Sequence, residues 1–435
     1  MTHGASSGLS APGVRLGSGP AADQKTSGLS ACGVRLGSGP AAHGPSASQA
    51  ALAAGRLVFA AGASPPIRGG RPLVQGEVLC RLAEGRRAAM LPDLLGALFS
   101  LCGAVHRLTA RHAVAAALGI GATDADTART TARLRAATLR DHLQRLALDL
   151  PSRVPVGVAG APTWLARAPL PMLPASACAP GHDDELASGL QRMQAWLTRH
   201  LLGAPARDWW RAWLDDPARA AARWALGQDH PVARWHAAVH ERAASLRLPC
   251  RPLALLEGDP VQVRAGMREL ARALDADAGF AARPLWLGGT AETGPWTRCL
   301  SSSGHAVDTA WLRLASRIAD IARIACDEQA LRHGALALGD GEGIAWSEMA
   351  RGLLVHWVRL EPGSRDPALA RVQACRVLAP TEWNFHPDGG FAHWLSKAAP
   401  DAASVALAAA ALDPCVDFEV CEGAAAGSVN EAANA

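Results

Sequence analysis

The chain reads DPCVDF at residues 413–418, close to its end, and LCGAV at residues 101–105, in its first quarter. Each segment contains one cysteine, Cys415 or Cys102, and no second cysteine follows three residues later. Taken alone, each cysteine is most simply a buried apolar thiol, which is the usual environment of a free cysteine. The motifs found in the rest of the chain favour another interpretation.

Five further motifs accompany the cysteine segments. They are LAEGR at residues 82–86, DH at 141–142, ETGPWTR at 292–298, EMARGLLVH at 348–356 and APTEWN at 379–384. Together with the cysteine segments they resemble, in the same order, seven landmarks of the large subunit of nickel–iron hydrogenases. In that family each cysteine segment is a Cys-x-x-Cys pair. Each motif is modest, but seven in one order, over residues 82–421, form a specific resemblance.

The resemblance implies a mainly α fold with small β elements (α+β), like that of the hydrogenase large subunit. In that family four thiolates hold nickel, and two of them bridge it to an iron that carries cyanide and carbon monoxide, a soft centre suited to sulfur ligands. By the resemblance, Arg351 donates hydrogen bonds to a cyanide nitrogen, and Pro380, Thr381 and Asn384 line the same site. Without the family, Arg351 would be read as a surface arginine at the start of a helix.

The chain departs from the family at the metal ligands. Val105 and Phe418 stand where the second cysteines are expected, and neither side chain offers a lone pair. A gapped alignment would instead match His106 to a family histidine. Nickel is therefore not expected. Cys421 replaces the histidine at which a maturation protease cuts in the family, so we expect the tail, residues 422–435, to be retained.

A chain that keeps a metalloenzyme scaffold and lacks half of its ligand cysteines is expected to be a helper and not an enzyme. It resembles hydrogenase expression and formation proteins of the HupK and HoxV type. The resemblance implies a maturation scaffold in which Cys102 and Cys415 transiently hold iron carrying cyanide and carbon monoxide. The expected partners are the hydrogenase large subunit and other maturation proteins. The alternatives are a divergent catalytic large subunit and a metal-free pseudoenzyme that docks hydrogenase partners.

The composition sets further bounds. The net charge of +4 is small and the arginines are interleaved with acidic residues, so no nucleic-acid partner is expected. No apolar run reaches the roughly 18 residues of a spanning helix, so no membrane insertion is expected. The ten cysteines show no compact disulfide spacing, and no secretion signal is evident, which indicates a reducing cytoplasm. His236 and His240 have a zinc-compatible spacing but no evident third ligand.

The chain divides into three parts. Residues 7–22 nearly repeat at 27–42, and the Gly, Ser, Pro and Ala content of residues 1–50 predicts disorder. Residues 51–421 form the large-subunit-like domain, and residues 422–435 form the tail. Within the domain we predict strands at 56–59 and 372–378, a Pro-rich loop at 150–181, and helices at 79–87, 91–118, 127–148, 261–274 and 307–331. Helical segments across 185–247 carry six of the 14 tryptophans, which favours a core or a docking face over base stacking.

Overall fold

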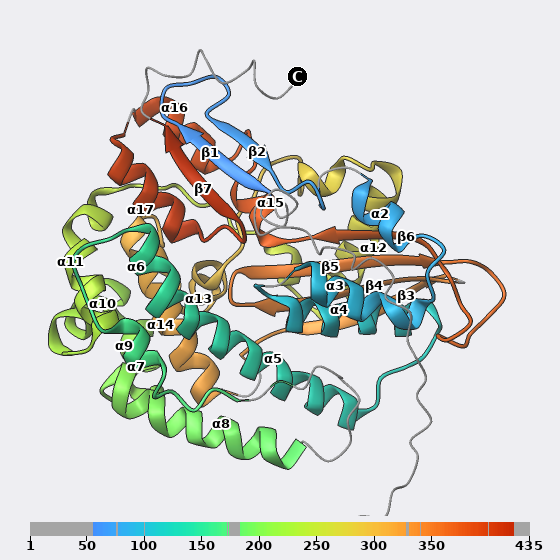
Figure 1. The fold of residues 1–435 in the computed structure, drawn as a ribbon, viewed down its shortest axis with the longest axis horizontal. Helices are drawn as coiled ribbons and strands as arrows, with labels where there is room; N and C mark the ends of the chain where they lie inside the picture. The colour runs from blue at the N-terminus through green and yellow to red at the C-terminus, as the bar shows by residue number, and fades with distance from the viewer. Residues whose placement is uncertain are drawn as a thin grey trace, which may run out of the picture. The chain divides into compact units, whose positions relative to one another are not determined.

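The computed structural model describes residues 55–74, 77–99, 101–171, 173, 183–327, 330–339, 341–398 and 400–421. The segment predicted to be disordered, residues 1–50, and the predicted tail, residues 422–435, lie outside the described residues. The described chain is rich in helices and contains two small sheets (Figure 1). This composition confirms the prediction of a mainly α fold with small β elements.

The three-stranded sheet joins the two ends of the described chain. Its strands are β1 (Arg56–Ala60), β2 (Ile67–Gly70) and β7 (Asp417–Cys421). The central strand β1 pairs antiparallel with β2 and parallel with β7, with Leu57 opposite Phe418. The ring of Phe418 lies 5.5 Å from that of Phe59. The residue that replaces a family cysteine therefore packs against an aromatic side chain of the first strand.

The four-stranded sheet is an antiparallel meander. Its strands are β3 (His333–Gly339), β4 (Glu342–Met349), β5 (Gly352–Leu360) and β6 (Val372–Leu378), of which only β6 was predicted. Helix α4 (Gly103–Ala117) packs closely on β4 and, with α3 (Leu91–Leu98), covers one side of this sheet (Figure 1). A Cβ atom at Gly343 would lie 2.5 Å from the carbonyl oxygen of Ala113, so only glycine permits this approach.

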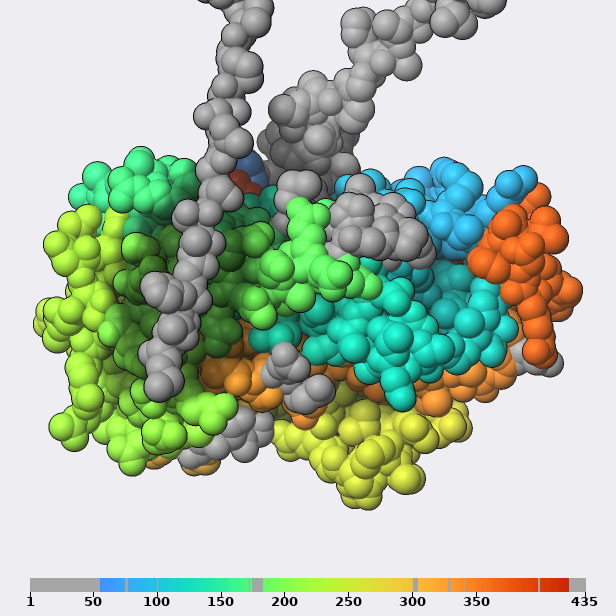
Figure 2. Space-filling view, turned by 90° about the horizontal axis from the view of Figure 1, so that it is seen from below, coloured from blue at the N-terminus to red at the C-terminus, as the bar shows by residue number. Residues whose placement is uncertain are grey.

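Helix α14 (Ala310–Cys326) has almost all of its residues buried. The other helices lie before and after it in the chain. They are α2 (Val78–Ala83), α5 (Asp124–Gln144), α6 (Leu150–Arg153), α7 (Ala161–Leu165), α8 (Asp183–Leu197), α9 (Ala206–Asp215), α10 (Pro217–Gly227), α11 (Pro231–Ser245), α12 (Pro260–Ala276), α13 (Pro295–Ser303), α15 (Pro380–Asn384), α16 (Gly390–Ala398) and α17 (Ala402–Leu412). Figure 2 shows the face on which residues near 120–150, 185–230 and 260–280 lie together.

Two predicted segments differ from the structure. The helix predicted over residues 91–118 is two helices, α3 and α4, because the chain turns between them. The Pro-rich segment 150–181 is not a continuous loop, since its described part contains the short helices α6 and α7, each with a proline in its first turn.

The tryptophan-rich segment is part of the core. Five of its six tryptophans are buried, whereas Trp210 is half-buried. His236 Nδ1 donates to the carbonyl of Val232 at 2.8 Å, and its ring packs edge-on against Trp224 and Trp235. Among the described residues no group of three or more metal-ligand side chains is present, and no helix is long and apolar enough to cross a membrane.

Candidate functional site

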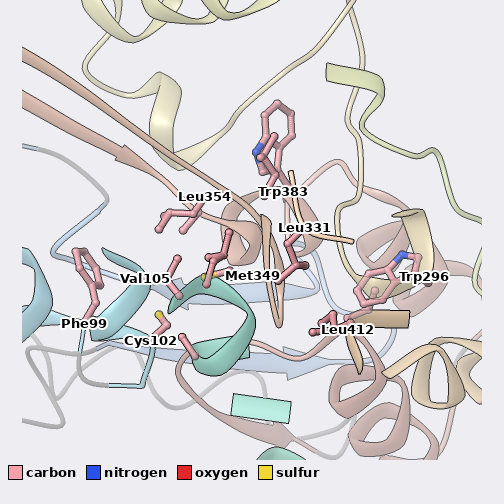
Figure 3. Close-up of a cluster of buried hydrophobic side chains, with 14 of the residues drawn as sticks. Phe99, Cys102, Val105, Trp296, Leu331, Met349, Leu354, Trp383 and Leu412 are labelled. Atoms are coloured by element: carbon pink, nitrogen blue, oxygen red, sulfur yellow. The ribbon is translucent and has the colours of Figure 1, made fainter. Parts of the chain in front are cut away.

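Cys102 lies in the turn that separates α3 from α4. It occupies the N-cap position of α4, and its carbonyl accepts hydrogen bonds from the backbone N–H groups of Val105 and His106. The helices approach closely here, because a Cβ atom at Gly103 would lie 2.2 Å from the carbonyl oxygen of Gly96. Figure 3 shows the Cys102 side chain in the buried cluster that also contains Val105.

Cys415 lies in the turn between α17 and β7. Helix α17 ends at Asp413, which has a left-handed backbone conformation (φ 56°) and reverses the chain. The backbone N–H of Cys415 donates to Thr381 Oγ1 at 3.0 Å. Two buried arginines hold the turn, since Arg145 donates to the carbonyl of Pro414 at 2.7 Å and Arg317 to that of Ala411 at 3.1 Å.

The structure brings the two cysteines side by side, as the resemblance implies. Their thiols share a hydrogen bond, which lowers the pKa of Cys415 well below its ordinary value and raises the pKa of Cys102 well above it. The charges of Arg351 and Arg71 further lower the pKa of Cys415. The shared proton is therefore drawn toward Cys102, and Cys415 has the greater thiolate character. Cys102 is buried and Cys415 is half-buried.

Arg351 lies in the turn between β4 and β5, buried beside this pair. The alternative of a surface arginine at a helix start is therefore wrong. Its Nε lies 3.6 Å from Asp413 Oδ1, and neither its Nε nor its Nη1 has a hydrogen-bond partner among the described residues. Burial opposes the charge of Arg351, but Asp413 and the two cysteines outweigh it and raise the pKa of the guanidinium.

Asp413 is surrounded by three guanidinium groups. Arg145 Nε donates to its Oδ1, Arg317 Nη1 donates to its Oδ2 at 2.8 Å, and Arg351 lies beside them. Burial favours the neutral acid, but these charges overcome it and lower the pKa of Asp413 well below its usual range. Asp149 supplies one more carboxylate to Arg145, at 2.7 Å. Arg145, Arg317 and Arg351 therefore form a charge cluster with Asp413 and Asp149 beside the cysteines.

A second buried ion pair lies on another side of the cysteines. Arg71 Nε donates to Glu382 Oε1 at 2.8 Å, and the guanidinium lies over the ring of Phe99. Arg71 Nη2 and Glu382 Oε2 have no hydrogen-bond partner in the described part of the chain. Burial raises the pKa of Glu382 to about 7, although Arg71 opposes the shift. Neither Arg71 nor Glu382 was among the site residues predicted from the sequence.

Two histidines pack next to Cys102. His106 Nδ1 and His356 Nε2 lie 3.0 Å apart, and the ring of Phe99 stacks on His106 at 4.0 Å. Burial lowers the pKa of both imidazoles, that of His356 to about 3, so both are neutral near pH 7. Because two neutral rings share one hydrogen bond, one nitrogen donates and the other accepts.

The predicted wall residues have different environments. Thr381 contacts Cys415 directly, and Pro380 begins α15, which carries Thr381. Asn384 Oδ1 accepts from the backbone N–H of Thr293 at 2.9 Å, and its amide nitrogen donates to the Thr293 carbonyl at 2.9 Å. Asn384 also donates to the Leu412 carbonyl at 3.4 Å, so its amide joins the turn before α13 to the end of α17.

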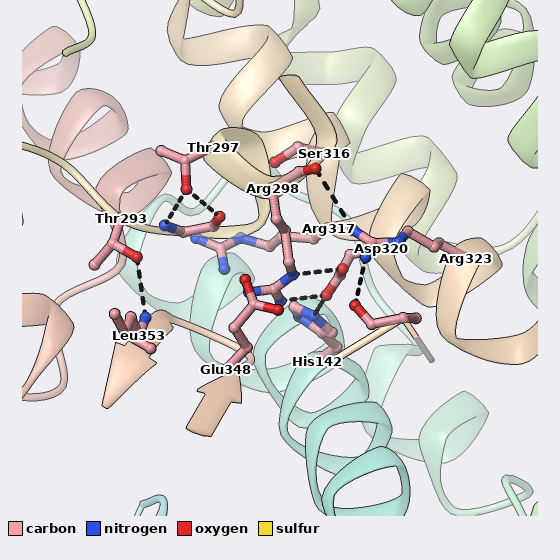
Figure 4. Close-up of polar contacts among 12 residues, drawn as sticks. His142, Thr293, Thr297, Arg298, Ser316, Arg317, Asp320, Arg323, Glu348 and Leu353 are labelled. Atoms are coloured by element: carbon pink, nitrogen blue, oxygen red, sulfur yellow. Dashed lines mark hydrogen bonds and ion pairs between the residues drawn. The ribbon is translucent and has the colours of Figure 1, made fainter. Parts of the chain in front are cut away.

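The DH and ETGPWTR motifs meet in a buried ionic network. Arg298 Nε donates to Asp320 Oδ1 at 2.7 Å, and His142 Nε2 lies 2.8 Å from Asp320 Oδ2 (Figure 4). These residues join α5, α13 and α14 into one frame around the site. Asp141, the neighbour of His142, is close enough to Arg351 and Cys415 to act on their charges, and burial raises its pKa to about 7.

Several residues of the site have no counterpart in the sequence analysis, namely Arg71, Arg145, Arg317 and Glu382. The sequence contains a signal for Arg145 and Arg317. Each arginine lies among apolar residues on the buried side of a helix, which indicates a buried charge. A π-helical turn, Arg145–Asp149, continues α5 at this point, and such turns are frequent at functional sites. Arg71 had no signal in the sequence.

Comparison with known proteins identifies the family. The chain is 38% identical over 403 residues to the hydrogenase expression/formation protein HoxV of Cupriavidus necator, covering 86% of this chain and 97% of that protein. It is 30% identical over 378 residues to the hydrogenase expression/formation protein HupK of Rhizobium leguminosarum bv. viciae, covering 82% and 91%. A chain of the [NiFeSe] hydrogenase of Dm. baculatum aligns with a TM-score of 0.44 and 12% identity, covering 80% of this chain and 93% of its own. No family model matches. The chain belongs to the family of hydrogenase expression/formation proteins of the HoxV and HupK type.

Proposed function

We propose that this maturation protein is a scaffold that holds an iron carrying cyanide and carbon monoxide and passes it to the hydrogenase large subunit. The observation that carries the proposal is the pair of adjacent cysteines, Cys102 and Cys415, beside the unpartnered N–H groups of Arg351. Two thiolates can fill fewer coordination positions of a metal centre than the four thiolates of the catalytic family. The iron group is therefore the cargo of this site and brings its remaining ligands with it.

The protonation state of the cysteines suits the capture of iron. A metal-binding cysteine must be a thiolate, and the hydrogen bond from Cys102 lowers the pKa of Cys415 and so favours that form. Only the proton shared by the pair has to leave when both sulfurs bind a metal. Sulfur ligands also suit an iron whose other ligands are cyanide and carbon monoxide.

The buried guanidinium groups suit an anionic guest. An unpartnered buried donor costs about 1–3 kcal/mol, more when it is charged, and a guest that accepts from it removes that cost. Cyanide nitrogen is an anionic acceptor and carbon monoxide is a poor one, so Arg351 would favour the cyanide side of the group.

Infrared spectroscopy of the protein purified without oxygen from a hydrogenase-forming host tests the proposal. We expect cyanide and carbonyl stretching bands in the wild-type protein and their loss in Cys102→Ala and Cys415→Ala. Cys80→Ala is the matched control, because Cys80 lies on α2, outside the site. Arg351→Gln should shift the cyanide bands more than the carbonyl band. A wild-type protein without such bands, from a host that forms active hydrogenase, would refute the proposal.

A further inference from the structure

A cavity of about 250 Å³ opens beside the cysteine pair. Strands β1 and β2 form one wall, where Gly69 and Gly70 contribute no side chains. The segment with Ala282 and Arg283 forms the rim, and α15 forms the floor. Arg283 is exposed and Ala282 is half-buried, whereas the floor residues are buried. The cavity thus leads from the surface into the interior.

The floor of this cavity is shared with the candidate site. Thr381 lines the cavity, and its Oγ1 accepts the backbone N–H of Cys415 at 3.0 Å. Arg71 also lines it and is close enough to both cysteines to act on their charges. A small group that reaches the floor is therefore separated from Cys415 by the side chains of Arg71, Thr381 and Glu382.

The floor also contains buried polar atoms without partners. The salt bridge between Arg71 and Glu382 uses one atom of each, which leaves Arg71 Nη2 and Glu382 Oε2 without a partner in the described chain. Arg283 at the rim adds a second positive charge to the path. An anionic group entering from the surface meets a guanidinium at the rim and another at the floor.

Two other cavities of the described chain lie in different places. A cavity of about 590 Å³ lies between α4, α5 and β3, and its described lining includes His112 and Ala335 but none of the residues that contact the pair. A cavity of about 60 Å³ is lined by Ala104 and Val105, close to Cys102 along α4, and is a rival path.

We infer that the cavity floored by Arg71, Thr381 and Glu382 is the port through which the anionic iron group enters and leaves, and that Arg71 selects for its negative charge. This inference rests on the proposed function. Arg71 selects for negative charge where the port meets the cysteines, while Arg351 donates hydrogen bonds to the iron group beside the cysteines. The port also fixes the side from which a donor or acceptor protein must approach, which is the side of β1, β2 and residues 282–283.

Alkylation of the empty protein tests the port without any iron. Ala282→Trp narrows the rim, and Ala282→Met is a milder version that keeps the test valid if tryptophan disturbs folding. Ala335→Trp places the same side chain in the 590 Å³ cavity as a control, and Ala104→Trp blocks the rival path. Peptide mapping by mass spectrometry gives the rates at Cys102 and Cys415, with Cys80 as an internal reference.

We expect Ala282→Trp to slow iodoacetamide labelling of Cys415 about tenfold, Ala282→Met to slow it less, and Ala335→Trp and Ala104→Trp to leave it unchanged. The ratio of iodoacetate to iodoacetamide rates isolates charge selection, because a change in thiolate content alters both rates alike. This ratio should fall about fivefold in Arg71→Gln/Glu382→Gln, which leaves no buried charge unpaired.

An unchanged rate of Cys415 labelling in Ala282→Trp, or a slower rate in Ala104→Trp alone, would overturn the port. An unchanged ratio of iodoacetate to iodoacetamide rates in Arg71→Gln/Glu382→Gln would overturn the role of Arg71. These outcomes are separate from the fate of the proposed function. If the wild-type protein shows no cyanide and carbonyl bands, the proposed function is refuted. If the wild-type protein shows these bands but Ala282→Trp is labelled at the wild-type rate, only the port is refuted.

Discussion

Arg351→Met distinguishes a cargo-binding arginine from a structural one. In the empty protein, Arg351 has two buried N–H positions without partners, which cost about 2–6 kcal/mol together. Its attraction to Asp413 at 3.6 Å returns about 4 kcal/mol at the effective dielectric constant of protein sites. These terms nearly cancel. We therefore expect Arg351→Met to change the free energy of unfolding by less than about 2 kcal/mol, while the cyanide and carbonyl bands disappear.

Arg145→Met is the matched comparison. Arg145 binds Asp413, Asp149 and the carbonyl of Pro414, so its loss leaves buried acceptors unpaired. Breaking a buried ion pair in this way costs about 3–5 kcal/mol. Urea unfolding of both metal-free variants, monitored by tryptophan fluorescence, gives the two free energies. If Arg351→Met destabilises the empty protein as much as Arg145→Met does, Arg351 is a structural residue and the argument for a guest fails.

Three further predictions concern catalysis, pH and the tail. The purified protein should not reduce an artificial acceptor with hydrogen, since Val105 and Phe418 provide no metal ligand; hydrogen-dependent dye reduction that Cys415→Ala abolishes would contradict this. The raised pKa values of Glu382 and Asp141, both about 7, mean that the folded state binds these protons more tightly than the unfolded state. Their contribution to stability is complete below about pH 4 and is lost as the pH rises through about 7. The urea concentration at the unfolding midpoint should therefore decrease as the pH is raised from 5 to 8. The decrease should be smaller in Glu382→Gln. Intact-mass spectrometry should find the residues after Cys421 still attached, and a chain that ends there would show cleavage.

The local sequence predicted some elements well. The strands at 56–59 and 372–378 and the helices α5 and α12 are present where their apolar spacing predicted them, and α14 is also present although it is buried on nearly all sides. Strands β4 and β5 were missed, since both of their faces are buried and the sequence shows no alternation. The turn before Cys102 was missed for another reason. The apolar spacing continues through it, and the break reflects the close approach of Gly96 and Gly103.

The site was predictable only where the family supplied the residue. Cys102, Cys415 and Arg351 came from the resemblance, and the structure places them together. Asn384 came from the same source, but its amide is engaged with the backbone of Thr293. Arg71 could not be predicted, because its meeting with the cysteines depends on how β2 and α15 pack. That packing joins segments more than 300 residues apart.

Val105 and Phe418 stand where the resemblance implies cysteines, and both side chains contribute to packing. Phe418 packs against Phe59 and under the guanidinium of Arg153, at 5.0 Å, so it anchors β7 to the rest of the fold. Val105 is buried in the cluster shown in Figure 3, on the turn of α4 that follows Cys102. Both positions now contribute to packing. Cysteine at both positions would remove the buried side chain of Val105 and the half-buried ring of Phe418, and loss of packed apolar groups destabilises a core beyond the lost transfer energy. Under the proposed function, the remaining pair of thiols would hold the iron group more weakly than four thiolates, as a carrier requires in order to release its cargo.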